Sequence, residues 1–156
     1  MAKLTFTGGI HPYDGKDLSK DKPMKAVLPK GDLVYPMSQH IGAPAVPIVQ
    51  KGDRVLTGQK IAEAGGFVSA PIYATVSGTV KAIEPRRIVT GDSVMSIVVE
   101  NDGLYEEVEY GPVKPLEELT KEEIIGLVKE AGVVGMGGAG FPTHVKLSPK
   151  EPEKIE

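Results

Sequence analysis

Cysteine and tryptophan are both absent from this chain of 156 residues. Without thiols, these residues form no disulfides and provide no thiolate ligands for iron–sulfur clusters. No apolar run approaches the ~20 residues that a membrane-spanning helix needs, and no apolar signal-peptide core follows Met1. The net charge of −3 provides no basic surface for nucleic acid. We therefore expect a cytoplasmic protein that neither inserts into a membrane nor binds nucleic acid.

Glycine and proline are abundant, with 19 and 13 residues. Average chains contain roughly 7% and 5%, so this composition favours a turn-rich β protein. Short apolar stretches separated by turn residues fill 46–62 and again 68–83. Both units contain Ala-Pro followed by a β run and a glycine turn, with the Ala-Pro pairs at 43–44 and 70–71. A later strand is predicted over 93–99. This mainly β organisation resembles the barrel-sandwich hybrid fold of biotinyl and lipoyl domains, in which two related halves pack face to face.

Biotinyl and lipoyl carriers present a modifiable lysine at a hairpin tip between the two halves, and this chain has no lysine there. Counting on from the Gly58-Gln59 pair to that tip reaches 65–69, and no lysine lies between Lys60 and Lys81. Function resides in sites rather than in folds. The resemblance in fold therefore predicts a scaffold rather than a swinging-arm carrier.

An acidic, proline-broken segment over 104–119 separates the β region from a predicted helix. Its charge pattern is more typical of a solvated linker than of a partner surface. The segment 120–123 (T-K-E-E) is a capping box, and Gly132 is predicted to end the helix in a left-handed conformation. Between them, apolar residues recur at helical spacing, at Ile124, Ile125, Leu127, Val128 and Ala131. A helix this short is marginal in water, so it must pack on the β region or fray.

Four glycines lie among the six residues 135–140, directly after the helix. Such a backbone has little side-chain bulk, so it can turn N–H groups onto an anion and lie flat against a planar ring. The G-x-G-x-x-G spacing of Gly135, Gly137 and Gly140 is weak evidence by itself, and a simple turn explains it equally well. Pro142 is predicted at the first position of a following helix, whose N-terminus would add partial positive charge.

The longer string over 135–146, read as G-x-G-G-A-G-F-P-T-x-x-K, resembles the flavin-binding signature of the NADH-oxidising flavoprotein subunit of respiratory complex I. With H-V-K-L at 144–147, the resemblance is closer to the RnfC family, the C subunits of the Rnf electron-transport complex. Two further segments occur in that family's order, F-T-G-G-I-H-P at 6–12 and Q-H-I-G-A-P-A at 39–45. The similarity runs from about residue 6 to the C-terminus.

The resemblance implies a site for flavin mononucleotide (FMN) and NADH that begins at this loop. The backbone against FMN and the entering nicotinamide would be that of Gly135, Gly137, Gly138, Ala139 and Gly140. Phe141 would provide apolar packing, and Lys146 would offer positive charge to the flavin or its phosphate. Complex I flavoproteins usually have arginine where this chain has Met136, and methionine does not make the charged contacts of arginine. No residue is predicted to be catalytic or to ligate a metal.

The three histidines show no spacing that joins them into a metal site. We interpret His11 as a turn residue and His40 as a packing residue on a strand edge. His144 marks the Rnf-like branch, because complex I flavoproteins usually have glycine there, and we do not expect it to be catalytic.

These patterns divide the chain into an N-terminal arm (1–25), a barrel-sandwich hybrid domain (26–103), the acidic linker (104–119) and the start of a truncated α/β domain for FMN and NADH (120–156). The resemblance implies the N-terminal part of a subunit of an ion-translocating ferredoxin:NAD⁺ oxidoreductase. That complex transfers electrons on the cytoplasmic face of a membrane and pumps Na⁺ or H⁺. The implied partners are other Rnf subunits, NADH and FMN, and two 4Fe-4S clusters would lie outside this cysteine-free chain. The fragment itself is expected to be a docking scaffold without bound cofactor or activity.

Two other interpretations stay open. One is a free-standing barrel-sandwich adaptor that binds other proteins without catalysis. The other is the A subunit of the Na⁺-pumping quinone reductase, although the intact G-G-A-G-F-P-T string argues against it.

Overall fold

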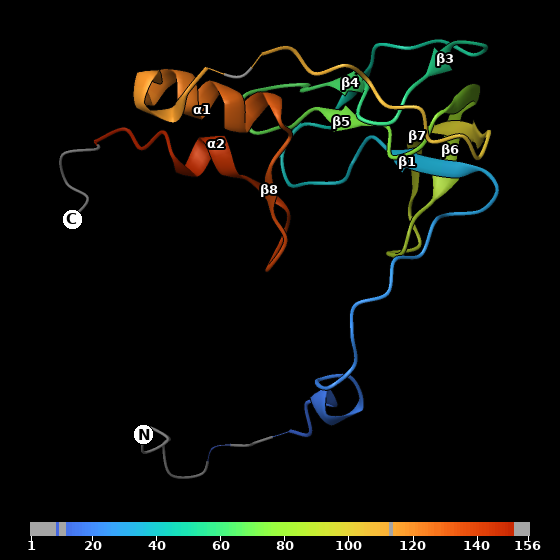
Figure 1. The fold of residues 1–156 in the computed structure, drawn as a ribbon, viewed down its shortest axis with the longest axis horizontal. Helices are drawn as coiled ribbons and strands as arrows, with labels where there is room; N and C mark the ends of the chain where they lie inside the picture. The colour runs from blue at the N-terminus through green and yellow to red at the C-terminus, as the bar shows by residue number, and fades with distance from the viewer. Residues whose placement is uncertain (1–8, 10–11, 113, 152–156) are drawn as a thin grey trace.

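Two antiparallel sheets form the body of the protein, as the mainly β prediction required (Figure 1). The computed structural model describes residue 9, residues 12–112 and residues 114–151. One sheet has the order β1-β7-β6-β3 and the other β2-β4-β5. Their strands are β1 (Leu33–Pro36), β2 (Val46–Pro47), β3 (Arg54–Val55), β4 (Lys60–Glu63), β5 (Ile72–Tyr73), β6 (Gly78–Arg87) and β7 (Ser93–Asn101).

A helical part follows the two sheets along the chain. It contains α1 and α2 with a short hairpin, β8-β9, between them. Two single turns of 3-10 helix, η1 and η2, lie in the N-terminal arm and before α1. The bounds are η1 (Lys16–Leu18), η2 (Leu116–Glu118), α1 (Lys121–Glu130), β8 (Val134–Gly135), β9 (Phe141–Pro142) and α2 (Thr143–Lys146). None of the helices in the described part of the chain has the length and hydropathy needed to cross a bilayer.

The N-terminal arm extends away from the two sheets (Figure 1). Its apolar side chains face solvent, with Leu18 69% and Met24 102% exposed. Most of the F-T-G-G-I-H-P motif at 6–12, His11 included, lies outside the described residues.

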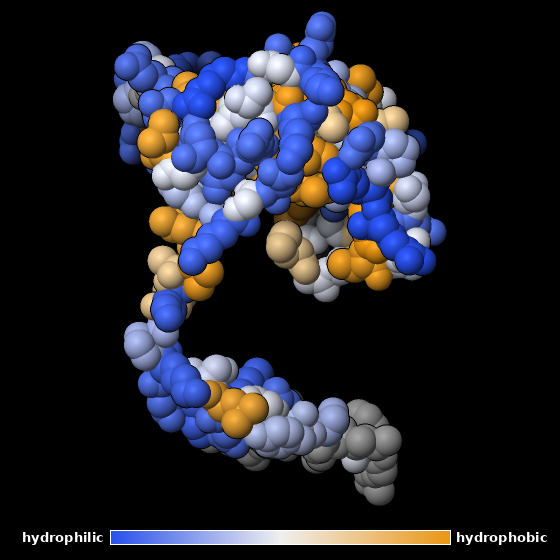
Figure 2. Space-filling model, turned by 90° about the vertical axis from the view of Figure 1, so that its right-hand side faces the viewer, coloured by the Kyte–Doolittle hydropathy of each residue, from blue (hydrophilic) through white to orange (hydrophobic). Residues whose placement is uncertain are grey.

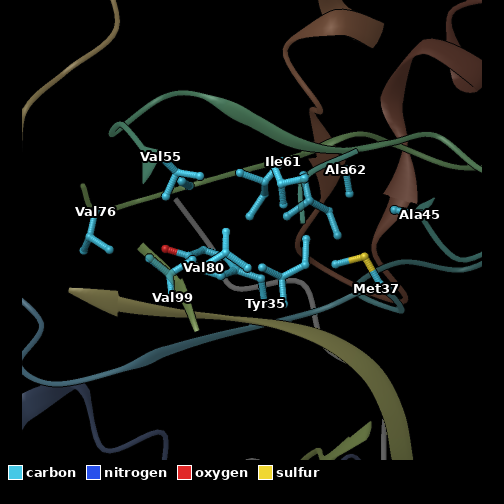
Figure 3. Close-up of a cluster of buried hydrophobic side chains, with 13 residues drawn as sticks. Tyr35, Met37, Ala45, Val55, Ile61, Ala62, Val76, Val80 and Val99 are labelled. Carbon is cyan, nitrogen blue, oxygen red and sulfur yellow. The ribbon is translucent and has the colours of Figure 1, made fainter. Parts of the chain in front are cut away.

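The hydrophobic core lies between the two sheets. Figure 3 shows Ile61 and Ala62 of β4 pointing toward Tyr35, Val80 and Val99, which come from β1, β6 and β7. All five side chains are buried. Burying one such aliphatic side chain contributes about 1.5–3 kcal/mol, so a cluster built mainly of valine, isoleucine and alanine holds the sheets together without tryptophan.

The predicted strand over 93–99 is confirmed as β7, the longest partner of β6. The two strands pair from Gly78↔Asn101 to Arg87↔Ser93, with a register shift between Val80 and Ala82. In the buried half of β7, Ile97 and Val99 enter the core cluster between the sheets. Val98 is also buried although it is not part of that cluster, since alternate residues of a strand point to opposite faces.

The acidic segment after β7 runs along the β domain, which is the two-sheet part of the chain formed by β1 to β7. It does not stand clear of that domain. The Thr57 N–H donates to the Glu106 carbonyl at 2.8 Å, and the Val108 N–H donates to the Thr57 carbonyl at 3.0 Å. Arg54 also pairs with the Glu106 carboxylate at 2.6 Å. Most of the segment's side chains stay exposed, so it is solvated and at the same time held by its backbone.

Helix α1 forms where the capping signals placed it. The Thr120 hydroxyl accepts from the Glu123 N–H, and the Glu123 carboxylate accepts from the Thr120 N–H. At the other end, Gly132 has φ +65° and donates to the Lys129 carbonyl, while the Val133 N–H donates to the Val128 carbonyl. These two bonds are a Schellman motif, which glycine favours because it lacks a Cβ.

Truncating the centre of the core tests this packing. We expect Ile97→Ala to lower the free energy of unfolding by about 2–5 kcal/mol, because Ile97 is fully buried and the lost methyl groups leave a cavity. Val89→Ala, at a fully exposed position, is the matched control and should change it by less than about 0.5 kcal/mol. Urea denaturation followed by circular dichroism measures both. Equal effects would mean that the core does not lie between these sheets.

Candidate functional site

The glycine-rich loop is the tip of the β8-β9 hairpin. Val134 pairs with Pro142 and Gly135 with Phe141, and residues 136–140 form the connection. The predicted order of helix and then loop is confirmed. Pro142 is the N-cap of α2 rather than its first residue, and α2 has four residues. So short a helix aligns few peptide dipoles, so we assign it no role in holding an anion.

Three of the predicted site residues meet at the base of this hairpin. The Lys146 Nζ lies 5.7 Å from the centroid of the Phe141 ring, within the range of a cation–π contact. A Cβ added to Gly135 would lie 3.2 Å from the same Nζ. The structure therefore places one positive charge and one aromatic ring beside the first glycine of the string.

Three other predicted residues form the exposed tip of the hairpin. Gly137, Gly138 and Ala139 all face solvent. A Cβ at Gly137 or Gly138 would have no heavy atom of residues 9, 12–112 or 114–151 within 4 Å, and neither glycine has a left-handed backbone. Packing within the chain therefore does not require glycine at these two positions. An open backbone in a hairpin whose base carries a lysine is an arrangement that fits an anionic cofactor such as FMN.

Gly140 differs from the tip glycines, because the β domain contacts it. Its φ is +67°, and an added Cβ would lie 3.1 Å from the Gln39 carbonyl oxygen and 3.2 Å from the His40 Cα. Next to it, the Ala139 carbonyl accepts from the Ile41 N–H at 3.2 Å. Two of the sequence motifs, at 39–45 and 135–146, therefore meet backbone to backbone.

His40 lies in a bend between β1 and β2, so its expected place on a strand edge was wrong. Its packing role is nevertheless evident, because the residue is 9% exposed. The Ala70 N–H donates to Nε2 at 3.1 Å, and Nδ1 lies 3.1 Å from the Ile41 carbonyl oxygen. A neutral ring with its proton on Nδ1 satisfies both bonds.

His144 is buried on α2 and packs against the tip between β4 and β5. Its Nε2 lies 3.3 Å from the Phe67 carbonyl oxygen, and the two rings meet edge to face at 6.5 Å. Phe67 falls in the 65–69 tip where a carrier domain would present its lysine. In this chain, that tip is a docking surface for α2.

Helix α1 is joined to the β domain by Glu130. The Lys60 ammonium donates to the Glu130 carboxylate at 2.5 Å, and the Tyr73 hydroxyl donates to the Glu130 backbone carbonyl.

The hydrogen bond between the Lys60 and Glu130 side chains lowers the pKa of Glu130 and raises the pKa of Lys60. The pair therefore stabilises the fold above the unfolded-state pKa of Glu130, and this stability is lost as the pH falls through the lowered folded pKa. It is lost again as the pH rises through the raised pKa of Lys60. The Glu130 side chain is 60% exposed, so the contribution is small.

A groove of about 780 Å³ opens between the β domain and the hairpin. Its walls come from β1, β5, the turn after β6, and β8, and are mostly apolar, including Ile72, Val89, Val134 and Met136. In the view of Figure 2, hydrophobic residues gather above a hollow on the underside of the molecule. The groove is within the range of volumes typical of ligand sites. Among the described residues, no three His, Asp or Glu side chains gather as metal ligands.

The fold and the loop together define a β-sandwich scaffold joined to the opening of a nucleotide-binding unit. A family model described as the RnfC barrel sandwich hybrid domain matches residues 4–104, and the chain belongs to this family. A second model, the Nuo51 FMN-binding domain, matches residues 128–156, which contain the whole glycine string. The resemblance derived from the three motifs and the predicted barrel-sandwich fold are both confirmed.

Curated relatives support the assignment to this family. Each of the three compared below is named as the C subunit of its complex. The chain is 46% identical over 153 residues to that of the Na⁺-translocating ferredoxin:NAD⁺ oxidoreductase complex of Acetobacterium woodii, covering 97% of this chain and 34% of that protein. It is 46% identical over 154 residues to the proton-translocating counterpart of Clostridium ljungdahlii, with the same coverage. The counterpart from the ion-translocating oxidoreductase complex of Vibrio cholerae is 41% identical over 144 residues, covering 91% of this chain and 19% of that protein. The chain thus spans about a third or less of these relatives.

Sequence reasoning found the glycine string, Phe141 and Lys146, but missed what holds them. The contacts of His40 and Ile41 with the hairpin join residues about 100 positions apart. The contact between Phe67 and His144 joins residues 77 positions apart. The motif at 39–45 was the sequence signal for this contact. A single sequence does not say which distant segment such a motif touches.

Two glycines of the hairpin should respond differently to alanine. We expect Gly140→Ala to weaken hairpin docking by about 1–2 kcal/mol, because its left-handed backbone disfavours a Cβ and Gln39 leaves little room. Gly138→Ala is the control, since its added methyl group meets open space. Hydrogen exchange of the Ile41 amide reports docking directly. The same exchange rate in both variants would show that the contact with Gly140 does not fix the hairpin.

Proposed function

We propose that this chain is the N-terminal part of the FMN- and NADH-binding subunit of an ion-translocating ferredoxin:NAD⁺ oxidoreductase, and that it takes part in electron transport. The observation that carries the proposal is the glycine hairpin, which presents an open backbone beside Lys146 within the stretch that matches an FMN-binding domain. Membership of the RnfC family and the names of the curated relatives support the same assignment.

The hairpin would bind the cofactor through its backbone. We assign the contact surface for FMN and the nicotinamide of NADH to Gly135, Gly137, Gly138, Ala139 and Gly140. Phe141 packs below the site and Lys146 pairs with negative charge on the cofactor, a charge-assisted contact worth about 1–3 kcal/mol. When bound, FMN supplies the redox chemistry between NADH and the iron–sulfur clusters, which would number two 4Fe-4S centres in the complete protein. Met136 offers no charge at the position where complex I flavoproteins usually have arginine.

Different parts of the chain would have different roles. The arm (1–25) and the barrel-sandwich domain (26–103) serve as a scaffold that docks on other subunits of the complex. The linker (104–119) leads to the first part of the FMN domain (120–156). This arrangement belongs at the cytoplasmic face of the membrane, where NADH and ferredoxin are found. The FMN-binding match over 128–156 weighs against a free-standing adaptor and against the quinone reductase subunit.

An FMN titration tests the assignment of the hairpin tip. In the complete subunit, we expect Gly138→Ala to weaken FMN binding by about tenfold, because a methyl group would hold the ring away from the backbone. The fold should be unaffected, since no heavy atom of the described residues lies within 4 Å of the added Cβ. Gly111→Ala, also at an open position, is the control. Equal affinity in both variants would exclude the tip as the contact surface. Tight binding by these 156 residues alone would contradict the proposed division.

Lys146 gives a second, electrostatic test. We expect Lys146→Met to weaken FMN binding in the complete subunit by about 5- to 100-fold, which corresponds to losing one charge-assisted contact. The loss should shrink as salt is added, because ions screen an exposed charge. Lys129→Met, an exposed lysine on α1, is the control for a change in net charge. A loss that is the same in both variants would assign the effect to overall charge.

A further inference from the structure

We infer that the β domain shapes the candidate flavin loop through residues 39–41, and that His40 is the positioning residue. This inference rests on the proposed FMN site. It goes beyond that proposal because it assigns a part in the site to a domain that would otherwise serve only as a scaffold.

The ring of His40 ties its own backbone to the β domain. It is 9% exposed, and Nε2 lies 3.1 Å from the Ala70 nitrogen and 3.2 Å from the Ala70 oxygen. On the other side, Nδ1 lies 3.1 Å from the Ile41 carbonyl oxygen. Buried polar groups are costly to leave unpaired, so the ring holds these two backbone segments at a fixed separation.

The backbone that His40 holds is the one that meets the loop. The Ile41 N–H donates to the Ala139 carbonyl, and Gly140 approaches Gln39 and the His40 Cα too closely to admit a Cβ without displacement. Because these two backbones are in direct contact, a displacement of residues 40–41 is transmitted to the last residues of the glycine loop.

The loop has little else to fix it. The β8-β9 ladder has two residues in each strand, and the tip residues 136–139 are exposed. Within the described part of the chain, the bond between Ile41 and Ala139 is the one backbone hydrogen bond from residues 136–140 to the β domain. A cofactor site must be held to within about 0.5 Å to work well, which a two-residue ladder does not ensure. The support from the β domain supplies this constraint.

The test compares variants of His40 with a matched buried hydrogen bond elsewhere. His40→Phe keeps a planar ring without nitrogen atoms, with His40→Leu as the second variant if the phenyl ring prevents folding. His40→Gln keeps an amide that can still pair with Ala70. Tyr35→Phe is the control, because the Tyr35 hydroxyl accepts from the Thr75 N–H at 3.0 Å and has no contact with the hairpin among its hydrogen bonds. Each variant is made in this chain and in the complete subunit.

Two measurements are then made, with a thermal melt of each variant beside them. In this chain without flavin, amide chemical shifts report the positions of Ala139 and Gly140. In the complete subunit, FMN fluorescence gives the affinity. We expect His40→Phe to move both amide signals and to weaken FMN binding by about tenfold, with His40→Gln within about threefold of the parent. Tyr35→Phe should lower the melting temperature and change neither readout.

The outcomes separate this inference from the proposed function. If the parent subunit binds no FMN, the proposed function fails, and the amide shifts in this chain still decide whether His40 holds the loop. If FMN binds but His40→Phe changes neither readout, the inference is overturned. It is also overturned if Tyr35→Phe weakens FMN binding as much, because the effect would then be general destabilisation. Moved amide signals with unchanged FMN affinity would likewise show that His40 does not position the cofactor.

Discussion

One buried polar side chain, the imidazole of His40, links the parts of the β domain on which the glycine hairpin docks. Because a buried ring must find hydrogen-bond partners, its position is dictated by the backbones of Ala70 and Ile41. Ala70 lies in the loop between β4 and β5, just after the tip, and Ile41 lies in the bend after β1. Once they are fixed, the surface on which the glycine hairpin docks is fixed as well. A buried polar residue thus lies directly behind the backbone that meets the candidate site.

The same tip between β4 and β5 explains how a carrier-like fold can serve a different purpose. Carrier domains leave this hairpin free, since its lysine must travel between active sites. Here the tip contains Phe67, whose ring and carbonyl contact His144 on α2. The tip is therefore held in place by its contact with α2, which lies much later in the chain. The position that carries chemistry in carriers is therefore an internal interface in this chain.

The glycines of the hairpin fall into two physical classes, which their sequence alone does not distinguish. Gly140 is required by the fold, because its backbone is left-handed and lies against Gln39 and His40. Gly137 and Gly138 have neither constraint, and an open backbone at these positions is compatible with the proposed close approach of a cofactor. The structure thus distinguishes a glycine that the fold itself requires from glycines that it leaves unconstrained.

Local patterns in the sequence determined the elements of this protein. The capping box at Thr120, the C-terminal glycine of α1, the strand over 93–99 and the glycine loop were all readable, because each depends on neighbouring residues. The family motifs also predicted Lys146 and Phe141 as site residues. Only the tertiary structure placed His40 in a buried bend rather than on a strand edge, and brought Ile41 to Ala139 and Phe67 to His144. These contacts close loops of about 80 to 100 residues, and they depend on how the C-terminal part packs on the β domain, which no local spacing encodes.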